Sequence, residues 1–349
     1  MIHLKNSLTA PLRTADVKVD AVCTALQQAI ELEHSTIPLY LYALYSIDSS
    51  RNPAVADIIQ SVAIEEMLHM TLASNILNAL GGSPKINGPT FIPTYPGHLP
   101  GAVEQHLVVN LAPFSMTQLE CFLEIEEPEN PLVFPVKPAL AAVPPESDTI
   151  GQFYAAISLA IASLGDGAFV NPPRNQVGPD LMDGSVIVTN VQTAQMAIST
   201  IVEQGEGTTN SPMEVAGGEV AHYYRFMEIK NGKMLVPDAG EPGGYSYSGA
   251  PVPFDPAGVY QLPVNPGVPP GYKPGSVQAF ANNNFNYTYT SLLNSLHILF
   301  NGDTSPQRMN EAIGLMMSLK GQAKAMMAGI PDNKVLTGPT FQYLPVLPS

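Results

Sequence analysis

The chain has 349 residues, of which 45% are hydrophobic and 13% charged, and this composition is typical of a globular protein. Acidic residues outnumber basic residues by 30 to 15, and the net charge of −15 is opposite to that of a nucleic-acid-binding protein. Two cysteines cannot form a disulfide framework, the N-terminus lacks a signal pattern, and no apolar run approaches the roughly eighteen residues of a membrane span. We therefore expect one soluble, cytoplasmic domain over 1–349, with neither a nucleic-acid nor a membrane partner.

A long helix is predicted over about 16–47. Its apolar positions recur in steps of four and three residues, and Glu33 lies within that buried stripe. Glu31 projects to the opposite side of the same helix. A carboxylate on a buried stripe is costly unless a partner compensates it. Glu33 is therefore the better candidate for a metal ligand, and Glu31 is expected to face solvent or to support a ligand from outside.

A second helix is predicted over about 54–80, where Glu66 and His69 continue the apolar stripe. Residues three apart on a helix share a face, so this pair could bind one metal ion together. A single Glu-x-x-His pair is common by chance, and a hydrogen-bonded core histidine is the alternative. Glu33 and His69 lie symmetrically about residue 51, within the predicted turn, so the two side chains should lie at the same depth of a helical hairpin.

Prolines and glycines interrupt the next segment, 84–190, and we interpret it as a long crossover containing helical stretches near 116–125 and 148–164. Helices are then predicted over about 191–206 and 213–230. The last of these carries a second Glu-x-x-His pair, Glu219 and His222, again on an apolar stripe. A proline-rich loop over 231–278 follows, and then two C-terminal helices within 279–330.

These elements place a glutamate on one helix and a Glu-x-x-His pair on the next, and then repeat that order after the crossover. Four carboxylates and two imidazoles in this order are the ligand set of dinuclear metal centres in ferritin-like four-helix bundles. The predicted metal ligands are Glu33, Glu66, His69, Glu203, Glu219 and His222. The predicted cofactor is a pair of metal ions, iron in preference to manganese.

The third helix offers two glutamates, and the symmetry of the predicted hairpins favours Glu203 over Glu206. Glu203 and His222 have their midpoint between Pro212 and Met213, at the break between the two helices. Glu206 would shift that midpoint into the fourth helix, and each residue of displacement changes the depth by about 1.5 Å. Glu206 is accordingly expected to lie beside the site, although a contact with metal stays open for both Glu206 and Glu31.

Four segments carry a resemblance to a known family: 33–42, 65–70, 201–207 and 219–226. They resemble the ferritin-like domain family of iminophenyl-pyruvate dimer synthase, which includes the N-terminal parts of VioB- and RebD-type proteins. The resemblance covers most of the chain and implies an all-α, ferritin-like four-helix bundle with a bound metal pair. It also implies an oxidoreductase of secondary metabolism that uses dioxygen or peroxide to oxidise or couple a small, iminopyruvate-type molecule. A non-catalytic metal-binding or storage protein is the alternative, and a homo-oligomer is left open.

Overall fold

The computed structural model describes residues 3–101, 107–129, 131–132, 148–208, 211–214, 218–329 and 336–344. Over these residues the chain is mainly helical, which confirms the predicted all-α class. The strands found there form two short antiparallel pairs, in which β1 (His3–Leu4) pairs with β2 (Asp148–Thr149) and β3 (Val236–Pro237) pairs with β4 (Tyr245–Ser246). None of the described helices has the length and apolarity needed to cross a membrane.

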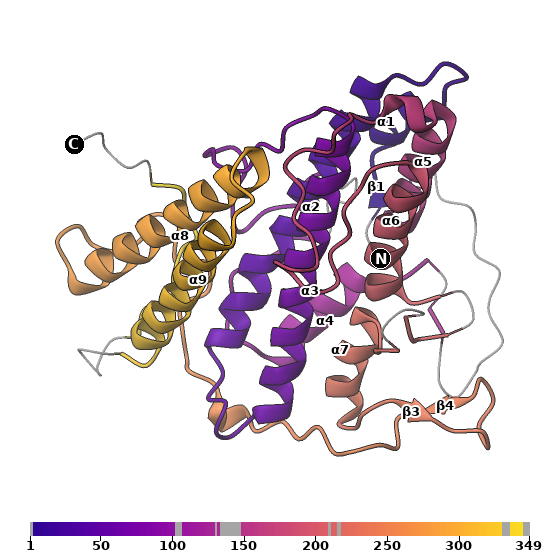
Figure 1. Ribbon diagram of the computed structural model, residues 1–349. Coiled ribbons are helices and arrows are strands. Elements are labelled where there is room, and N and C mark those ends of the chain that lie inside the picture. Colours follow the sequence, from indigo (N-terminus) through magenta and orange to yellow (C-terminus); the bar gives the residue numbers. More distant parts are fainter. Residues whose placement is uncertain are drawn as a thin grey trace.

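Four helices enclose the central core, and each packs against two others. They are α2 (Val19–Tyr45), α3 (Pro53–Ala79), α5 (Ile150–Leu164) and α6 (Val191–Glu206). Helices α2 and α3 form a long hairpin, α6 packs on α3, and α5 closes the ring by contacting both α6 and α2 (Figure 1). Capping boxes at Thr149 and Asn190 fix the first turns of α5 and α6.

Two shorter helices from distant parts of the chain pack together beside this bundle. Helix α4 (Met116–Glu126) contacts α7 (His222–Asn231), and α7 also contacts α3 and α6. The remaining short helical elements are α1 (Asn6–Thr9), η1 (Ala10–Arg13), η2 (Asp166–Ala168) and η3 (Pro256–Gly258).

The C-terminal helices form a second hairpin against the other side of the α2–α3 pair. Helix α8 (Val277–Asn301) contacts α3, and α9 (Pro306–Met327) contacts α2. Both are seen in orange and yellow in Figure 1. The α2–α3 hairpin is thus covered on two sides, which explains why it is buried along most of its length.

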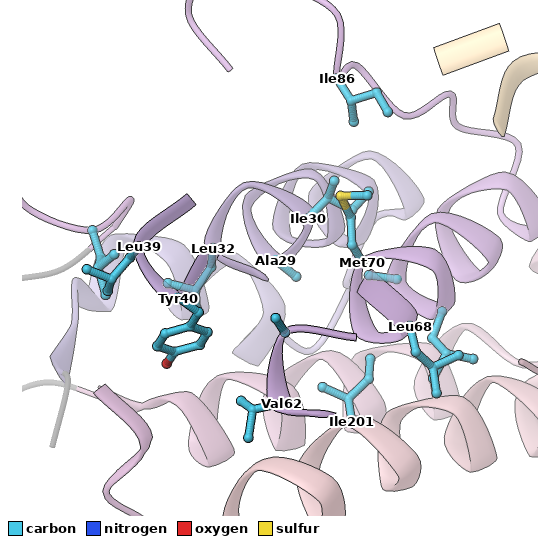
Figure 2. Close-up of a cluster of buried hydrophobic side chains, with 14 of the residues drawn as sticks. Ala29, Ile30, Leu32, Leu39, Tyr40, Val62, Leu68, Met70, Ile86 and Ile201 are labelled. Carbon is cyan, nitrogen blue, oxygen red and sulfur yellow. The ribbon is translucent and has the colours of Figure 1, made fainter. Parts of the chain in front are cut away.

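The core of the bundle is formed by aliphatic side chains of α2, α3 and α6. Figure 2 shows Ala29 and Leu32 of α2 with Val62 of α3 and Ile201 of α6, all of which are buried. At about 25 cal/mol for each Å² of apolar surface removed from water, such contacts supply most of the stabilisation of a helical bundle. The polar cluster described below therefore lies in an otherwise apolar interior.

The helix predicted over 213–230 is the main departure from the sequence-based prediction, because α7 begins only at His222. Before it, Met213 and Val220 form an isolated antiparallel bridge, and the amide of Glu214 donates to the carbonyl of Glu219. Gly218 has a φ of +69°, a conformation that is incompatible with an α-helix and that glycine adopts readily. The prediction followed the apolar period and gave too little weight to this break.

Candidate metal centre

Two groups of three acidic and imidazole side chains meet in the bundle interior. The first group is Glu33, Glu66 and His69, and the second is Glu66, Glu126 and His222. Within each group the three ligand atoms all lie within 4.8 Å of one another, which is close enough to share one cation. Glu66 belongs to both groups, so the two positions are adjacent.

The first group comes from the long hairpin. His69 Nδ1 lies 3.5 Å from Oε2 of Glu33 and 3.9 Å from Oε1 of Glu66. The Tyr154 hydroxyl of α5 donates to Oε1 of Glu33, and the Thr36 hydroxyl donates to Oε2 of Glu66 at 3.1 Å. Each carboxylate therefore has one oxygen held by the protein and one directed toward the imidazole.

The second group is completed by the ends of the two short helices. His222 is the first residue of α7, and Glu126 is the last residue of α4. The Nδ1 atom of His222 lies 3.0 Å from Oε1 of Glu66 and 3.5 Å from Oε2 of Glu126. The hydroxyl of Tyr40 donates to the other oxygen of Glu126. The contact between α4 and α7 therefore brings together residues that are almost one hundred positions apart.

Partners outside the cluster orient both imidazoles. His69 Nε2 lies 3.0 Å from the Gln204 side-chain oxygen, and His222 Nε2 lies 3.0 Å from a Glu65 carboxylate oxygen. Arg225 in turn donates two hydrogen bonds of 2.8 Å to Glu65. A partner that accepts from Nε2 keeps the ring proton there and leaves Nδ1 free to bind a metal ion.

The His222 Nδ1 atom has no hydrogen-bond partner within the described part of the chain, although the side chain is fully buried. Its distance to Glu66 is short, but the ring is not oriented for a hydrogen bond. An unpaired buried nitrogen is costly in an apolar interior. The donor set and this unpaired atom together fit a cation that accepts the nitrogen lone pair.

Burial and charge shift the pKa values of these groups strongly. Burial, with the nearby Glu126 carboxylate, raises the pKa of Glu66 to about 8. Burial alone would lower the pKa of His222, but the three carboxylates around its ring, those of Glu126, Glu65 and Glu66, raise it well above its usual value. Burial would raise the pKa of Glu33, but the hydrogen bond and charge of His69, together with the hydrogen bond from Tyr154, outweigh it and the pKa is lowered. Without metal, protons on the imidazoles and on Glu66 therefore balance the negative charge.

The structure brings four of the six predicted ligands, Glu33, Glu66, His69 and His222, into this cluster and leaves two outside it. Glu219 is exposed and precedes the first turn of α7, so it cannot share a helical face with His222. Glu203 lies in an outer groove, where Ser199 donates to it at 2.7 Å.

Glu206, rather than Glu203, lines the cavity beside the cluster. The symmetry argument that favoured Glu203 assumed that α6 and the next helix form a tight hairpin, and the late start of α7 removes that assumption. Glu31 accepts hydrogen bonds from Gln27 and Gln28 and does not belong to the metal-ligand groups found among the described residues.

Four residues that belong to the cluster or contact it were not singled out from the sequence: Glu126, Tyr154, Gln204 and Glu65. Glu126 directly follows the helix predicted near 116–125 and belongs to the acidic segment 124–127, which has the pattern of a solvated surface. Glu65 is adjacent to Glu66 and lies on another face of the helix, which is why it reaches His222 from the outer side. No spacing in the sequence indicates that α4 and α7 meet.

A cavity of about 50 Å³ adjoins the cluster, and a larger groove of about 460 Å³ lies outside it between α5 and α6. Glu206 and Val202 line both spaces. The Gly151 amide donates to the Glu206 carboxylate, and a Cβ atom at Gly151 would lie 2.9 Å from both carboxylate oxygens. A side chain at position 151 would therefore displace the Glu206 carboxylate, which lies between the surface groove and the inner cavity.

The fold and the cluster together define a helical-bundle protein with a buried carboxylate–histidine centre, and comparison with known proteins places it in a family. The family model described as "Ferritin-like" matches residues 26–231, and the chain belongs to this ferritin-like family. The matched region includes every member of both ligand groups.

Among solved structures, the fold is similar to that of a ferritin-like protein from Caulobacter vibrioides. The TM-score is 0.63 at 24% sequence identity, and the match covers 93% of this chain and 97% of the other. This likeness supports the fold over nearly the whole length of the chain. No curated protein matches the chain.

Proposed function

We propose that the two groups bind two metal ions that share Glu66, and that the protein is an oxidoreductase acting on a small organic molecule with dioxygen or peroxide. The observation that carries the proposal is the shared carboxylate, because Glu66 lies in both groups of potential ligands. A bridging carboxylate between two N,O-ligated cations is characteristic of dinuclear centres in ferritin-like bundles. In this assignment Glu33 and His69 hold one ion, and Glu126 and His222 hold the other.

The donor set favours iron, with manganese as the alternative, because carboxylate and imidazole ligands without thiolate suit these borderline-hard cations. When bound, an iron pair would supply electrons and Lewis acidity for reaction with the oxidant. Glu206 offers a fourth carboxylate at the edge of the same cavity. The protein's own groups fix the ligands: Tyr154 and Tyr40 hold two carboxylates, and Gln204 and Glu65 hold the two imidazoles.

The two spaces around Glu206 suggest how reactants are separated. The inner cavity of about 50 Å³ has room for little more than one or two water-sized molecules, whose share of liquid volume is roughly 30 Å³ each. The oxidant fits there, and bulk water does not. The open groove between α5 and α6 can hold an organic molecule, with Glu206 at the boundary. We therefore propose that the organic substrate binds in this groove and that Glu206 moves to admit its reacting group.

The resemblance to the iminophenyl-pyruvate dimer synthase family points to the class of substrate. It favours the imine of an aromatic 2-oxo acid, oxidised or oxidatively coupled to a second copy. A substrate of this kind has a planar apolar ring and a carboxylate.

One observation favours the alternative, a non-catalytic metal-binding or storage protein. The inner cavity is too small for an organic molecule in this conformation. A bundle that admits only ions and small oxidants is also what metal storage requires. The open groove is the feature that storage does not need.

Oxygen consumption separates the two functions. Protein reconstituted anaerobically with ferrous iron is first analysed for metal content, and two ions per chain are expected. Dioxygen uptake is then followed with and without the imine of phenylpyruvate. Uptake that continues over many turnovers only when the imine is present supports the oxidoreductase. A single stoichiometric uptake, unchanged by the imine, indicates storage, and the absence of bound metal overturns both.

A further inference from the structure

A second cavity, of about 250 Å³, lies between the α2–α3 pair and the C-terminal hairpin α8–α9. It is on a different side of α2 from the metal cluster, because Glu33 faces the cluster whereas the next residue, His34, lines this cavity. The lining is almost entirely aliphatic, aromatic and methionine side chains, and it includes no Asp, Glu, Lys or Arg among the described residues. This space is therefore distinct from the centre proposed above and has different chemistry.

His34 is the main polar feature of the lining, and it is incompletely satisfied. Its side chain is 3% exposed, and its Nε2 atom lies 2.7 Å from the hydroxyl oxygen of Tyr289. Its Nδ1 atom has no hydrogen-bond partner in the described ranges. Buried polar atoms in folded proteins are nearly always paired, so an unpaired imidazole nitrogen beside a cavity indicates a place for a missing partner.

The position of the ring proton follows from counting donors and acceptors. None of the described lining residues is a carboxylate that could balance a charge on this buried ring, so the ring is neutral and carries one proton. If the Tyr289 hydroxyl donates to Nε2, the ring proton is on Nδ1, and only this one group is unpaired. If Nε2 donates instead, both the Nδ1 lone pair and the hydroxyl proton of Tyr289 lack partners. The first arrangement leaves fewer buried groups unpaired, and it makes Nδ1–H a hydrogen-bond donor.

We propose that this cavity binds a neutral, mainly apolar molecule whose single oxygen acceptor, a carbonyl or ether oxygen, accepts a hydrogen bond from Nδ1 of His34. A carboxylate is disfavoured because none of the described lining residues carries a positive charge to pair with it. An apolar cavity of roughly 150 Å³ holds benzene, so this one has room for about two fused rings or a short alkyl chain.

Access to the cavity is from the surface between α3 and α9. Ile64 and Ile313 both line the cavity, and they are 51% and 41% exposed. Exposed isoleucines at a cavity mouth present an apolar route for an apolar ligand. The proposal does not depend on the metal centre, so either can fail without the other.

A pair of isosteric probes tests the hydrogen bond separately from apolar binding. 2-Acetylnaphthalene has a carbonyl oxygen where 2-isopropenylnaphthalene has a methylene group. We expect calorimetric titration of the full chain to show one site and a preference of about tenfold for the ketone, the typical contribution of one hydrogen bond. Absence of binding, or equal affinity for the two probes, would overturn the proposal.

Two variants locate the site. Leu296→Trp fills the cavity from α8 and should abolish binding of both probes, whereas Leu159→Trp, on the exposed face of α5, should leave both affinities unchanged. His34→Phe keeps an aromatic ring without nitrogen, so it should retain the hydrocarbon and lose the preference for the ketone. A preference that persists in His34→Phe contradicts the assignment.

A measurement on the wild-type protein tests the same hydrogen bond without relying on correct folding of the His34 variant. In protein labelled with ¹⁵N-histidine, the Nδ1–H signal of His34 should shift on addition of the ketone and move much less with the hydrocarbon. An Nδ1 atom that carries no proton, or a signal that responds equally to both probes, contradicts the proposal.

Discussion

Oε2 of Glu65 lies 3.0 Å from Nε2 of His222, on the side of the ring opposite the metal-ligand groups. This carboxylate keeps a proton on Nε2 and makes Nδ1 more basic. We predict that Glu65→Gln lowers metal affinity by about 10- to 100-fold, the usual effect of removing such a partner, while two ions still bind at saturation. Competition with a chromophoric chelator measures the affinity. Glu120→Gln, which removes a surface pair with Lys230, is the matched control and should have no effect.

Arg225 compensates the charge of Glu65, because its guanidinium donates to both carboxylate oxygens. The two side chains are only 8% and 18% exposed, so neither charge is well solvated alone. Arg225→Met should destabilise the metal-free protein by about 3–5 kcal/mol, the cost typical of leaving one buried charge unpaired. Denaturant titration measures the loss. The double variant with Glu65→Gln should recover part of it, and a purely additive double variant would contradict the pairing.

Metal content distinguishes the cluster in the structure from the ligand set predicted by spacing. Glu126→Ala should reduce bound metal from two ions toward one, because Glu126 belongs to the second group alone. Glu203→Ala and Glu219→Ala should each retain two ions, because neither residue lies in the cluster. Elemental analysis of the three purified variants decides the matter. Loss of metal in Glu219→Ala with full metal in Glu126→Ala would restore the spacing-based assignment.

The metal-free protein should lose stability as the pH rises from about 5 to 8. Burial raises the pKa of Glu66 from 4.5 to about 8, so over this window the folded state holds a proton that the unfolded state has released. The pKa values of His69 and His222 are also raised, which extends the loss above pH 6.5. When the folded state binds more protons than the unfolded state, the free energy of unfolding falls as the pH rises. The raised pKa of Glu206, about 7, adds to the loss. The lowered pKa of His34 acts with opposite sign below about pH 6.5, and those of Glu33 and Glu65 do so below about pH 4.5, so the loss is steepest above pH 6.5.

Metal should reverse this trend, because the ions replace the protons on the same groups. Melting temperatures measured at pH 5.5 and pH 8 should therefore fall with pH in the presence of a chelator and rise with pH in excess ferrous or manganous ion. Parallel changes with and without metal would show that the cluster does not exchange protons for ions.

The sequence predicted those parts of the site that lie on regular, long helices. Glu33, Glu66 and His69 lie on uninterrupted apolar stripes, and a period of 3.6 residues is enough to place them on one face of α2 and α3. His222 was found through its motif, although its supposed partner Glu219 precedes the helix. Periodicity cannot detect a backbone turn such as that at Gly218, where the residue type permits a left-handed conformation without requiring it.

Glu126 could not be predicted from spacing, because its place depends on tertiary contact. Helix α4 lies within the proline-rich crossover, and only its packing against α7 brings Glu126 to His222. Likewise α5 was predicted as a helix but not as a wall of the bundle, so Tyr154 was not expected at Glu33. The apolar pattern of a short helix such as α4 covers too few residues to show which other helix packs against it. That contact is known only from the structure.

The order of the ligands along the chain has a consequence for biosynthesis. Glu33, Glu66 and His69 leave the ribosome together as one hairpin, whereas His222 follows His69 by 153 residues (222 − 69). At 5–20 residues per second this interval is roughly 8–30 s. During that time all three members of the first group have been synthesised and His222 has not. In the proposed assignment the ligands of the first ion are therefore made well before the second position, which forms only when the late helix α7 docks.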